Sequence, residues 1–69
     1  VALVISGPGV TNALTAIGQA WADSTPVLLL SSETDSSTHG RGWGCLHEIP
    51  DQSAVTAPLT ALSARVNHP

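Results

Sequence analysis

The sequence predicts an α/β fold built on a parallel sheet, and three observations lead to this prediction. Residues 1–5 and residues 27–30 are short apolar runs without polar alternation, a pattern typical of strands that are covered on both faces. Between them, apolar residues recur at helical spacing. Two such strands joined by one helix form a βαβ unit, in which the strands pair in parallel.

The helix is predicted from Thr11 to Asp23. The apolar residues that share one of its faces are Val10, Leu14, Ile17 and Trp21. Gly18 costs roughly 1 kcal/mol relative to alanine in a helix, so its presence predicts a close approach of another element. Pro26 separates the helix from the second strand.

The remainder of the chain is less regular. Residues 31–45 are polar and glycine-rich without periodicity, which is typical of a long loop that is functional or mobile. A short helix is predicted from Asp51 to about Ala57, with Asp51 as its N-cap and Pro58 ending or kinking it. Residues 59–66 are predicted to form a third short strand.

The composition excludes several classes of protein. Two arginines stand against five acidic residues in a chain of 69 residues, and the net charge of −3 argues against a nucleic-acid partner. The single cysteine cannot form an internal disulfide and fits a reducing compartment, so we expect a cytoplasmic protein. The apolar runs are too short for a membrane span. Because the first residue already lies inside a strand pattern, we expect residues 1–69 to be part of one domain, truncated at both ends.

The stretch Gly7-Pro8-Gly9 is the first candidate binding site. It joins a predicted strand to a predicted helix, at the carboxyl edge of the sheet where α/β proteins bind ligands. Glycine lets a ligand approach the main chain, and the first N–H groups of the helix lack intrahelical partners. The turn lacks the lysine of a phosphate-binding P-loop, and Ser6 is not placed as in a nucleophile elbow.

The order of these motifs resembles one family. Ser-Gly-Pro-Gly-Val-Thr-Asn from Ser6 to Asn12, a helix, an Asp-Ser-Thr-Pro stop and an apolar strand follow one another. This series resembles the pyrimidine-binding domain of thiamine-diphosphate enzymes of the acetolactate synthase and 2-oxo-acid decarboxylase group. Residues 40–52 are more similar to a branch that includes 5-guanidino-2-oxopentanoate decarboxylases.

The resemblance implies a three-layer α/β domain and a thiamine-diphosphate-dependent reaction of a 2-oxo acid, either decarboxylation or carboligation. In this family the cofactor lies between two domains, commonly of two subunits, so a homodimer or homotetramer is implied. The glutamate that activates the aminopyrimidine precedes the region present here, and Mg²⁺ and the diphosphate are bound by another domain. We therefore expect this chain alone to be inactive.

The resemblance also assigns residues. Gly7, Pro8, Gly9 and Asn12 match positions that contact the aminopyrimidine, although Pro8 could simply form a turn and Asn12 could satisfy the first helical turn. His47 stands where acetolactate synthases carry a glutamine near the substrate, and an imidazole there could bind a carboxylate or transfer a proton. A surface histidine in a loop is the alternative.

Other polar residues carry weaker expectations. Glu33 is not expected to be the activating glutamate, because the family places that residue before the Gly-Pro-Gly strand. The loop residues that could recognise substrate, meet a partner subunit or have only a structural role are His39, Arg41 and Trp43. Glu48 could pair with Arg41 or face solvent. Cys45 is expected to be a packed thiol, and no zinc-site spacing is present. A non-catalytic α/β module that binds an anion or serves in subunit assembly remains the alternative function.

Overall fold

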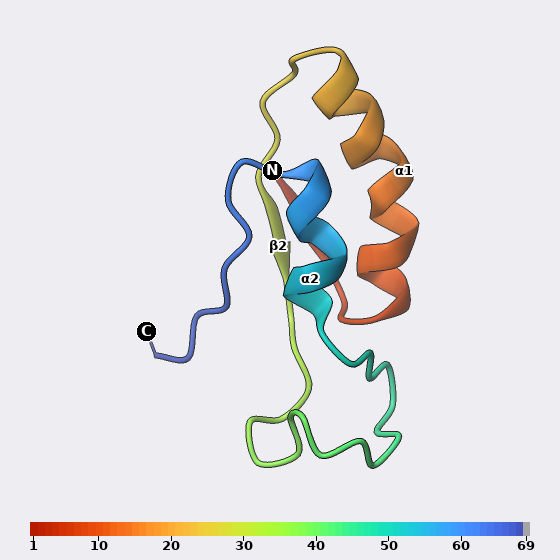
Figure 1. Cartoon of the computed structure of the whole chain (residues 1–69), viewed down its shortest axis with the longest axis vertical. Helices are drawn as coiled ribbons and strands as arrows, with labels where there is room; N and C mark the ends of the chain where they lie inside the picture. Colours follow the sequence, from red (N-terminus) through yellow and green to blue (C-terminus); the bar gives the residue numbers. More distant parts are fainter. Residues whose placement is uncertain (69) are drawn as a thin grey trace.

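The computed structural model describes residues 1–68 and confirms an α/β architecture (Figure 1). Its elements, in order, are β1 (Ala2–Val4), α1 (Pro8–Ala22), β2 (Leu29–Ser31), α2 (Gln52–Thr56) and a 3₁₀-helix, η1 (Ala57–Leu59). The strands pair in parallel, with Ala2 opposite Leu29 and Val4 opposite Ser31. The predicted βαβ unit is therefore present, and its second strand is shorter and later than the predicted run.

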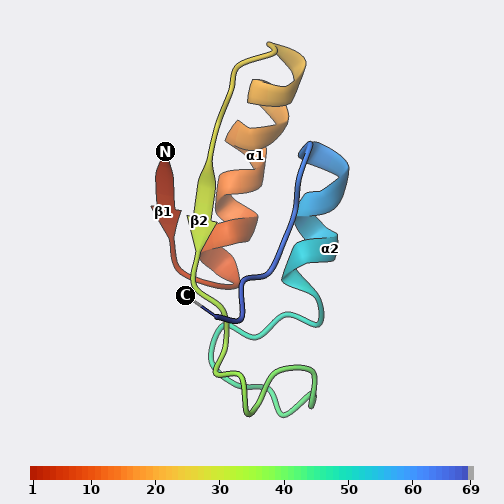
Figure 2. The same ribbon diagram turned by 90° about the vertical axis from the view of Figure 1, so that its left-hand side faces the viewer.

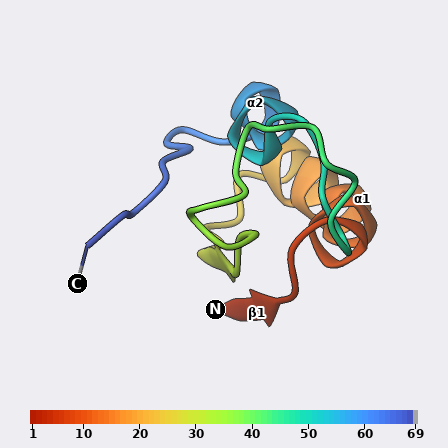
Figure 3. The same ribbon diagram turned by 90° about the horizontal axis from the view of Figure 1, so that it is seen from below.

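Both α-helices lie on the same side of the two-stranded sheet (Figures 2 and 3). The carboxyl ends of both strands and the amino end of α1 lie at one end of the molecule, where the long loop between β2 and α2 also begins (Figure 1). The junction between β1 and α1 and the junction between β2 and the loop thus meet at one edge, which is where parallel sheets bind ligands.

Helix α1 begins at Pro8, three residues earlier than predicted. Proline is favoured at the first helical position because its φ is already helical and its missing N–H would have no intrahelical partner. Gly7 precedes it as the N-cap, with φ 64° and ψ −111°. The prediction began at Thr11 because the Gly-Pro-Gly stretch was interpreted as a turn, whereas its last two residues are helical.

The apolar core is small. Val10 and Ile17 on α1 are buried and Leu14 is half-buried, but Trp21 is exposed, so the predicted apolar face is covered only along its first part. The expected cover on both faces of the sheet is not provided by residues 1–68, because Leu3 is 77% exposed. A largely apolar cavity of about 720 Å³ lies between α1, β2 and residues 60–66.

The second half of the chain departs from one prediction. The Asp51 carboxylate accepts a hydrogen bond from the Ala54 N–H at 2.9 Å, which confirms the predicted N-cap of α2. The prediction of a third strand over residues 59–66 is wrong, because this part of the chain folds back onto α2 instead. The Thr60 N–H donates to the Ala57 carbonyl oxygen, and the Thr60 hydroxyl donates to the Thr56 carbonyl oxygen. The Ser63 hydroxyl donates to the Ser53 carbonyl oxygen.

Within the described residues, no helix is long and apolar enough to cross a membrane.

Two glycines of α1 provide a matched test of its packing. A Cβ atom at Gly18 would meet only Leu59 Cδ1 at 4.0 Å, so the predicted close approach is absent. We expect Gly18→Ala to stabilise the protein by about 0.5–1 kcal/mol through helix propensity. A Cβ atom at Gly9 would lie 2.9 Å from Ile5 Cγ2, so Gly9→Ala should destabilise it. Denaturant unfolding of both variants checks this, and equal effects would contradict it.

Candidate functional site

A buried glutamine side chain joins the segments at the carboxyl edge. Gln52, the first residue of α2, is 9% exposed. Its Oε1 accepts a hydrogen bond from the Gly7 N–H at 2.8 Å. Its Nε2 donates to the Ser32 carbonyl oxygen at 3.0 Å and to Ser31 Oγ at 3.3 Å. One carboxamide therefore holds the residue before α1, the end of β2 and the start of α2.

Ser32 closes the same network from the sheet side. Its hydroxyl oxygen accepts from the Ser6 N–H at 3.0 Å, and its own N–H donates to the Val4 carbonyl oxygen at 3.3 Å. Ser6 is itself buried. The parallel pairing thus continues one residue beyond β2, with a side chain replacing the next main-chain partner.

The backbone of His47 packs directly against Gly7. A Cβ atom at Gly7 would overlap the carbonyl oxygen of His47, and the φ of +64° is unfavourable for any residue with a side chain. His47 has a φ of 65°, a left-handed conformation that is uncommon for residues other than glycine, although asparagine, aspartate and histidine adopt it more often than most. The structure therefore brings together two of the predicted site regions, Gly7 and His47, through a main-chain contact.

Pro8 and Asn12 remain accessible on the first turns of α1. Both are exposed, and residues four apart lie next to each other on one helix face. Within residues 1–68 no side chain caps the amino end of α1 by hydrogen bonding, so Asn12 does not satisfy the first turn as its alternative interpretation suggested. Gly9 is half-buried against Ile5. Of the four predicted cofactor residues, two present their side chains to the outside, and Gly7 is enclosed.

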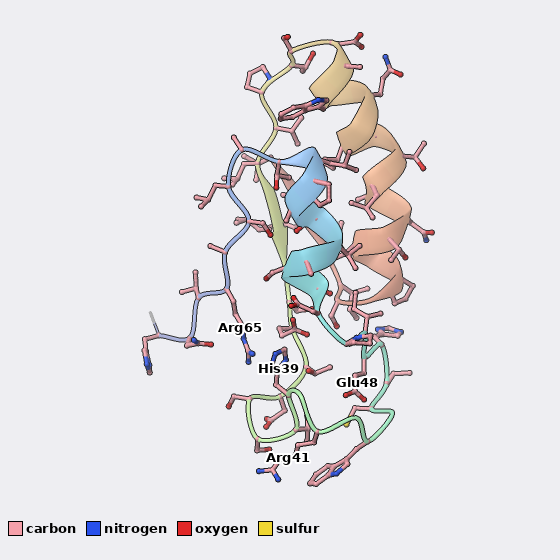
Figure 4. The ribbon with its side chains drawn as sticks, viewed as in Figure 1. His39, Arg41, Glu48 and Arg65 are labelled. Atoms are coloured by element: carbon pink, nitrogen blue, oxygen red, sulfur yellow. The ribbon has the colours of Figure 1, made fainter. Side chains whose placement is uncertain are left out.

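The loop between β2 and α2 is braced by local hydrogen bonds. The Asp35 carboxylate accepts from the N–H and the hydroxyl of Ser37, and these bonds lower the pKa of that carboxyl. The guanidinium of Arg41 donates to the Ser37 carbonyl oxygen and lies 5.1 Å from the ring centre of Trp43, a cation–π distance. Arg41 points away from the strands at the far end of the loop (Figure 4), which favours the solvent-facing interpretation.

Glu48 forms a second brace close to His47. Its Oε2 accepts from the Cys45 N–H at 2.8 Å, while its own N–H donates to the Cys45 carbonyl oxygen at 2.9 Å. Glu48 lies between the loop and α2, and His39 and Arg65 come from other segments on the same end of the molecule (Figure 4). Cys45 is a free, half-buried thiol. Glu33 accepts from the N–H of the next residue, Thr34.

Gln52 and Ser32 were not among the residues predicted for the site. Gln52 directly follows the Asp51 N-cap, a position where the sequence pattern predicts only a helix start. Its acceptor interaction spans 45 positions and its donor interactions span 20 and 21. Only Ser32 carried a local signal, because it is a polar residue that follows the apolar run of residues 27–30.

The contact between Gly7 and His47 generates a steric prediction. Gly7→Ala should destabilise the protein by about 3 kcal/mol or more, because the new methyl group overlaps a main-chain oxygen and the backbone angle is strained. Gly40→Ala is the matched control, since Gly40 has a φ of 75° but nothing within 4 Å of its Cβ position. The control should show only the smaller strain effect. Similar melting temperatures for the two variants would contradict the contact.

Comparison with known proteins identifies the family of this chain. Residues 1–55 match the family model described as thiamine pyrophosphate enzyme, N-terminal TPP binding domain. A probable 2-ketoarginine decarboxylase of Pseudomonas aeruginosa is 64% identical over 93% of this chain and 11% of its own length. The 2-hydroxyacyl-CoA lyase 2 of Xenopus laevis is 40% identical over 97% of the chain and 10% of its own. The acetolactate synthase large subunit of Lactococcus lactis is 33% identical over 96% and 11%.

The chain spans about a tenth of the length of these curated relatives. No solved structure matches it. The family match covers β1, α1, β2, the long loop and most of α2, and so includes every residue of the network around Gly7. The chain belongs to the thiamine pyrophosphate enzyme family and represents part of its N-terminal, cofactor-binding domain.

Proposed function

We propose that this segment forms part of the cofactor site of a thiamine-diphosphate-dependent 2-oxo-acid decarboxylase. The observation that carries the proposal is the similarity to a probable 2-ketoarginine decarboxylase, which extends over almost the whole chain. Similarity to acetolactate synthases and 2-hydroxyacyl-CoA lyases is lower. Decarboxylation is therefore favoured over carboligation, and 2-ketoarginine, which is 5-guanidino-2-oxopentanoate, is the proposed substrate.

The exposed face of the α1 amino end suits the flat aminopyrimidine of the cofactor. Pro8 offers a rigid apolar ring, and Asn12, one turn later, offers a carboxamide that can both donate and accept. Gly9 lets the start of α1 pack against Ile5 behind this surface, and Gly7 sets the chain direction before it. We propose these four residues as the aminopyrimidine wall. Bound thiamine diphosphate supplies the electron acceptor that decarboxylation requires, and the protein supplies placement.

His47 is proposed as a substrate contact. Its main chain packs on Gly7, so its position is fixed relative to the wall formed by Pro8 and Asn12. The imidazole is half-buried, and in its protonated form it can pair with the carboxylate of a 2-oxo acid. A histidine whose backbone is held in a left-handed conformation next to a binding wall fits a positioned group better than a free loop residue.

The remaining parts of the site are proposed to lie elsewhere in the parent protein. Among residues 1–68 there is no group of three or more histidine, cysteine or acidic residues that could hold a metal ion. We propose that another domain binds Mg²⁺ and the diphosphate. The exposed Leu3 and the apolar cavity support packing of this partial domain, residues 1–69, against further polypeptide. A homodimer or homotetramer in the cytoplasm is proposed as the assembly.

The activity itself can be measured on the full-length parent. We expect it to release carbon dioxide from 2-ketoarginine only when thiamine diphosphate and Mg²⁺ are supplied, and the 69-residue chain alone to release none. Pyruvate, with acetolactate detection, is the control for carboligation. A folded parent that binds no thiamine diphosphate would support the non-catalytic module. Turnover by the isolated chain would contradict the proposed division of the site.

The role of His47 is tested by an asparagine substitution, because asparagine tolerates the left-handed backbone. His47→Asn should raise the KM for the 2-oxo acid at least about tenfold, since it removes a charged hydrogen bond to the substrate. His39→Asn, the same change at a second histidine of the loop, should leave kcat and KM near wild type. Equal kinetic constants for both variants would assign His47 to the surface alternative.

A further inference from the structure

We infer that Gln52 is a positioning residue for the cofactor wall, an inference that rests on the proposed function. Gln52 does not reach the exposed face of α1. It acts through Gly7, whose N–H it binds at 2.8 Å and whose position determines where α1 begins. The proposed contacts Pro8 and Asn12 lie in the first two turns of that helix, so their placement depends on the same hydrogen bond.

The chemistry of the site requires a carboxamide. At one end the Gly7 N–H needs an acceptor, and at the other the Ser32 carbonyl oxygen needs a donor. The carboxamide of asparagine or glutamine carries a donor and an acceptor on one planar group without a charge at any pH in the physiological range, and glutamine has the longer reach. No buried side-chain nitrogen or oxygen in the described part of the chain lacks a partner. Both the oxygen and the nitrogen of the Gln52 carboxamide therefore have hydrogen-bond partners.

The two partners of the carboxamide lie on different elements. Ser32 follows β2 and is tied to the sheet through Ser6 and Val4, whereas Gly7 leads into α1. Gln52 is itself fixed at the first position of α2, because the Asp51 side chain caps that helix. The glutamine thus sets the orientation of the α1 amino end relative to the carboxyl end of β2. A small displacement there moves the whole exposed wall, and catalytic rates are sensitive to such misplacement.

Two substitutions in the full-length protein test this inference. Gln52→Leu removes donor and acceptor at similar size, so the amino end of α1 is no longer held against β2, and a misplacement of about 1 Å can weaken function roughly tenfold to a hundredfold. We expect the Kd for thiamine diphosphate to rise by about that factor and kcat to fall, with the KM for the 2-oxo acid changing less. Gln19→Leu is the matched control, because Gln19 is an exposed glutamine of α1 whose side chain, among residues 1–68, bonds Asp23 alone.

Gln52→Glu provides a readout that loss of packing would not produce. The ionised carboxylate can accept from Gly7 but cannot donate to the Ser32 carbonyl oxygen. When protonated, the same group donates and accepts as the amide does, and burial raises its pKa. We therefore expect the cofactor Kd of this variant, taken relative to wild type at each pH, to recover as the pH falls. Near-ultraviolet circular dichroism of the bound cofactor should shift in parallel.

The outcomes separate this inference from the proposed function. Wild-type protein that binds no thiamine diphosphate overturns both. Wild-type protein that binds it, with Gln52→Leu unchanged in Kd and kcat, overturns only the inference, even if the melting temperature falls. If Gln52→Leu does not fold, Gln52→Glu decides the question. Recovery at low pH supports positioning, and a pH-independent ratio to wild type overturns it.

Discussion

The hydrogen bond from the Gly7 N–H to Gln52 Oε1 is the interaction on which the arrangement of this chain depends. It is buried and joins positions 45 residues apart, so it connects the first βα junction to the start of α2. Leaving such a buried donor unmatched costs about 1–3 kcal/mol, more than the net gain from most single hydrogen bonds. Among residues 1–68 the buried apolar residues are Val10 and Ile17, so this polar link carries a large share of the tertiary organisation.

The contact between His47 and Gly7 follows from that link. Because Gln52 lies five residues after His47, fixing Gln52 against Gly7 also brings the end of the long loop onto the same glycine. Gly7 has no side chain and His47 has a left-handed backbone, and together these two features allow their main chains to come into contact. A loop of this length would otherwise be free to move, but its end is held at the site and its middle is braced internally.

Local pattern determined which elements could be predicted. The parallel strands, the long helix and the Asp51 cap were predicted correctly. Apolar periodicity and helix capping depend on residues that are only a few positions apart in the sequence. The start of α1 was misplaced because Pro8 serves both a turn and a first helical position. The third strand failed because Thr60 and Ser63 bond back to α2 and η1, and an isolated apolar run cannot show which partner it will find. Gln52 was missed because its partners lie far away in the sequence.

Gly7 and its neighbours combine a structural role with the proposed cofactor contact. The N–H of Gly7 is used inside the chain, and the next residue, Pro8, has no N–H to satisfy. The Gly7 N–H is therefore matched within the chain, so the proposed wall does not depend on a ligand to satisfy it. Its outer side, Pro8 and Asn12, is left accessible. A site assembled in this way depends on rigid support from behind, since preorganised geometry determines how much binding energy is lost to ordering.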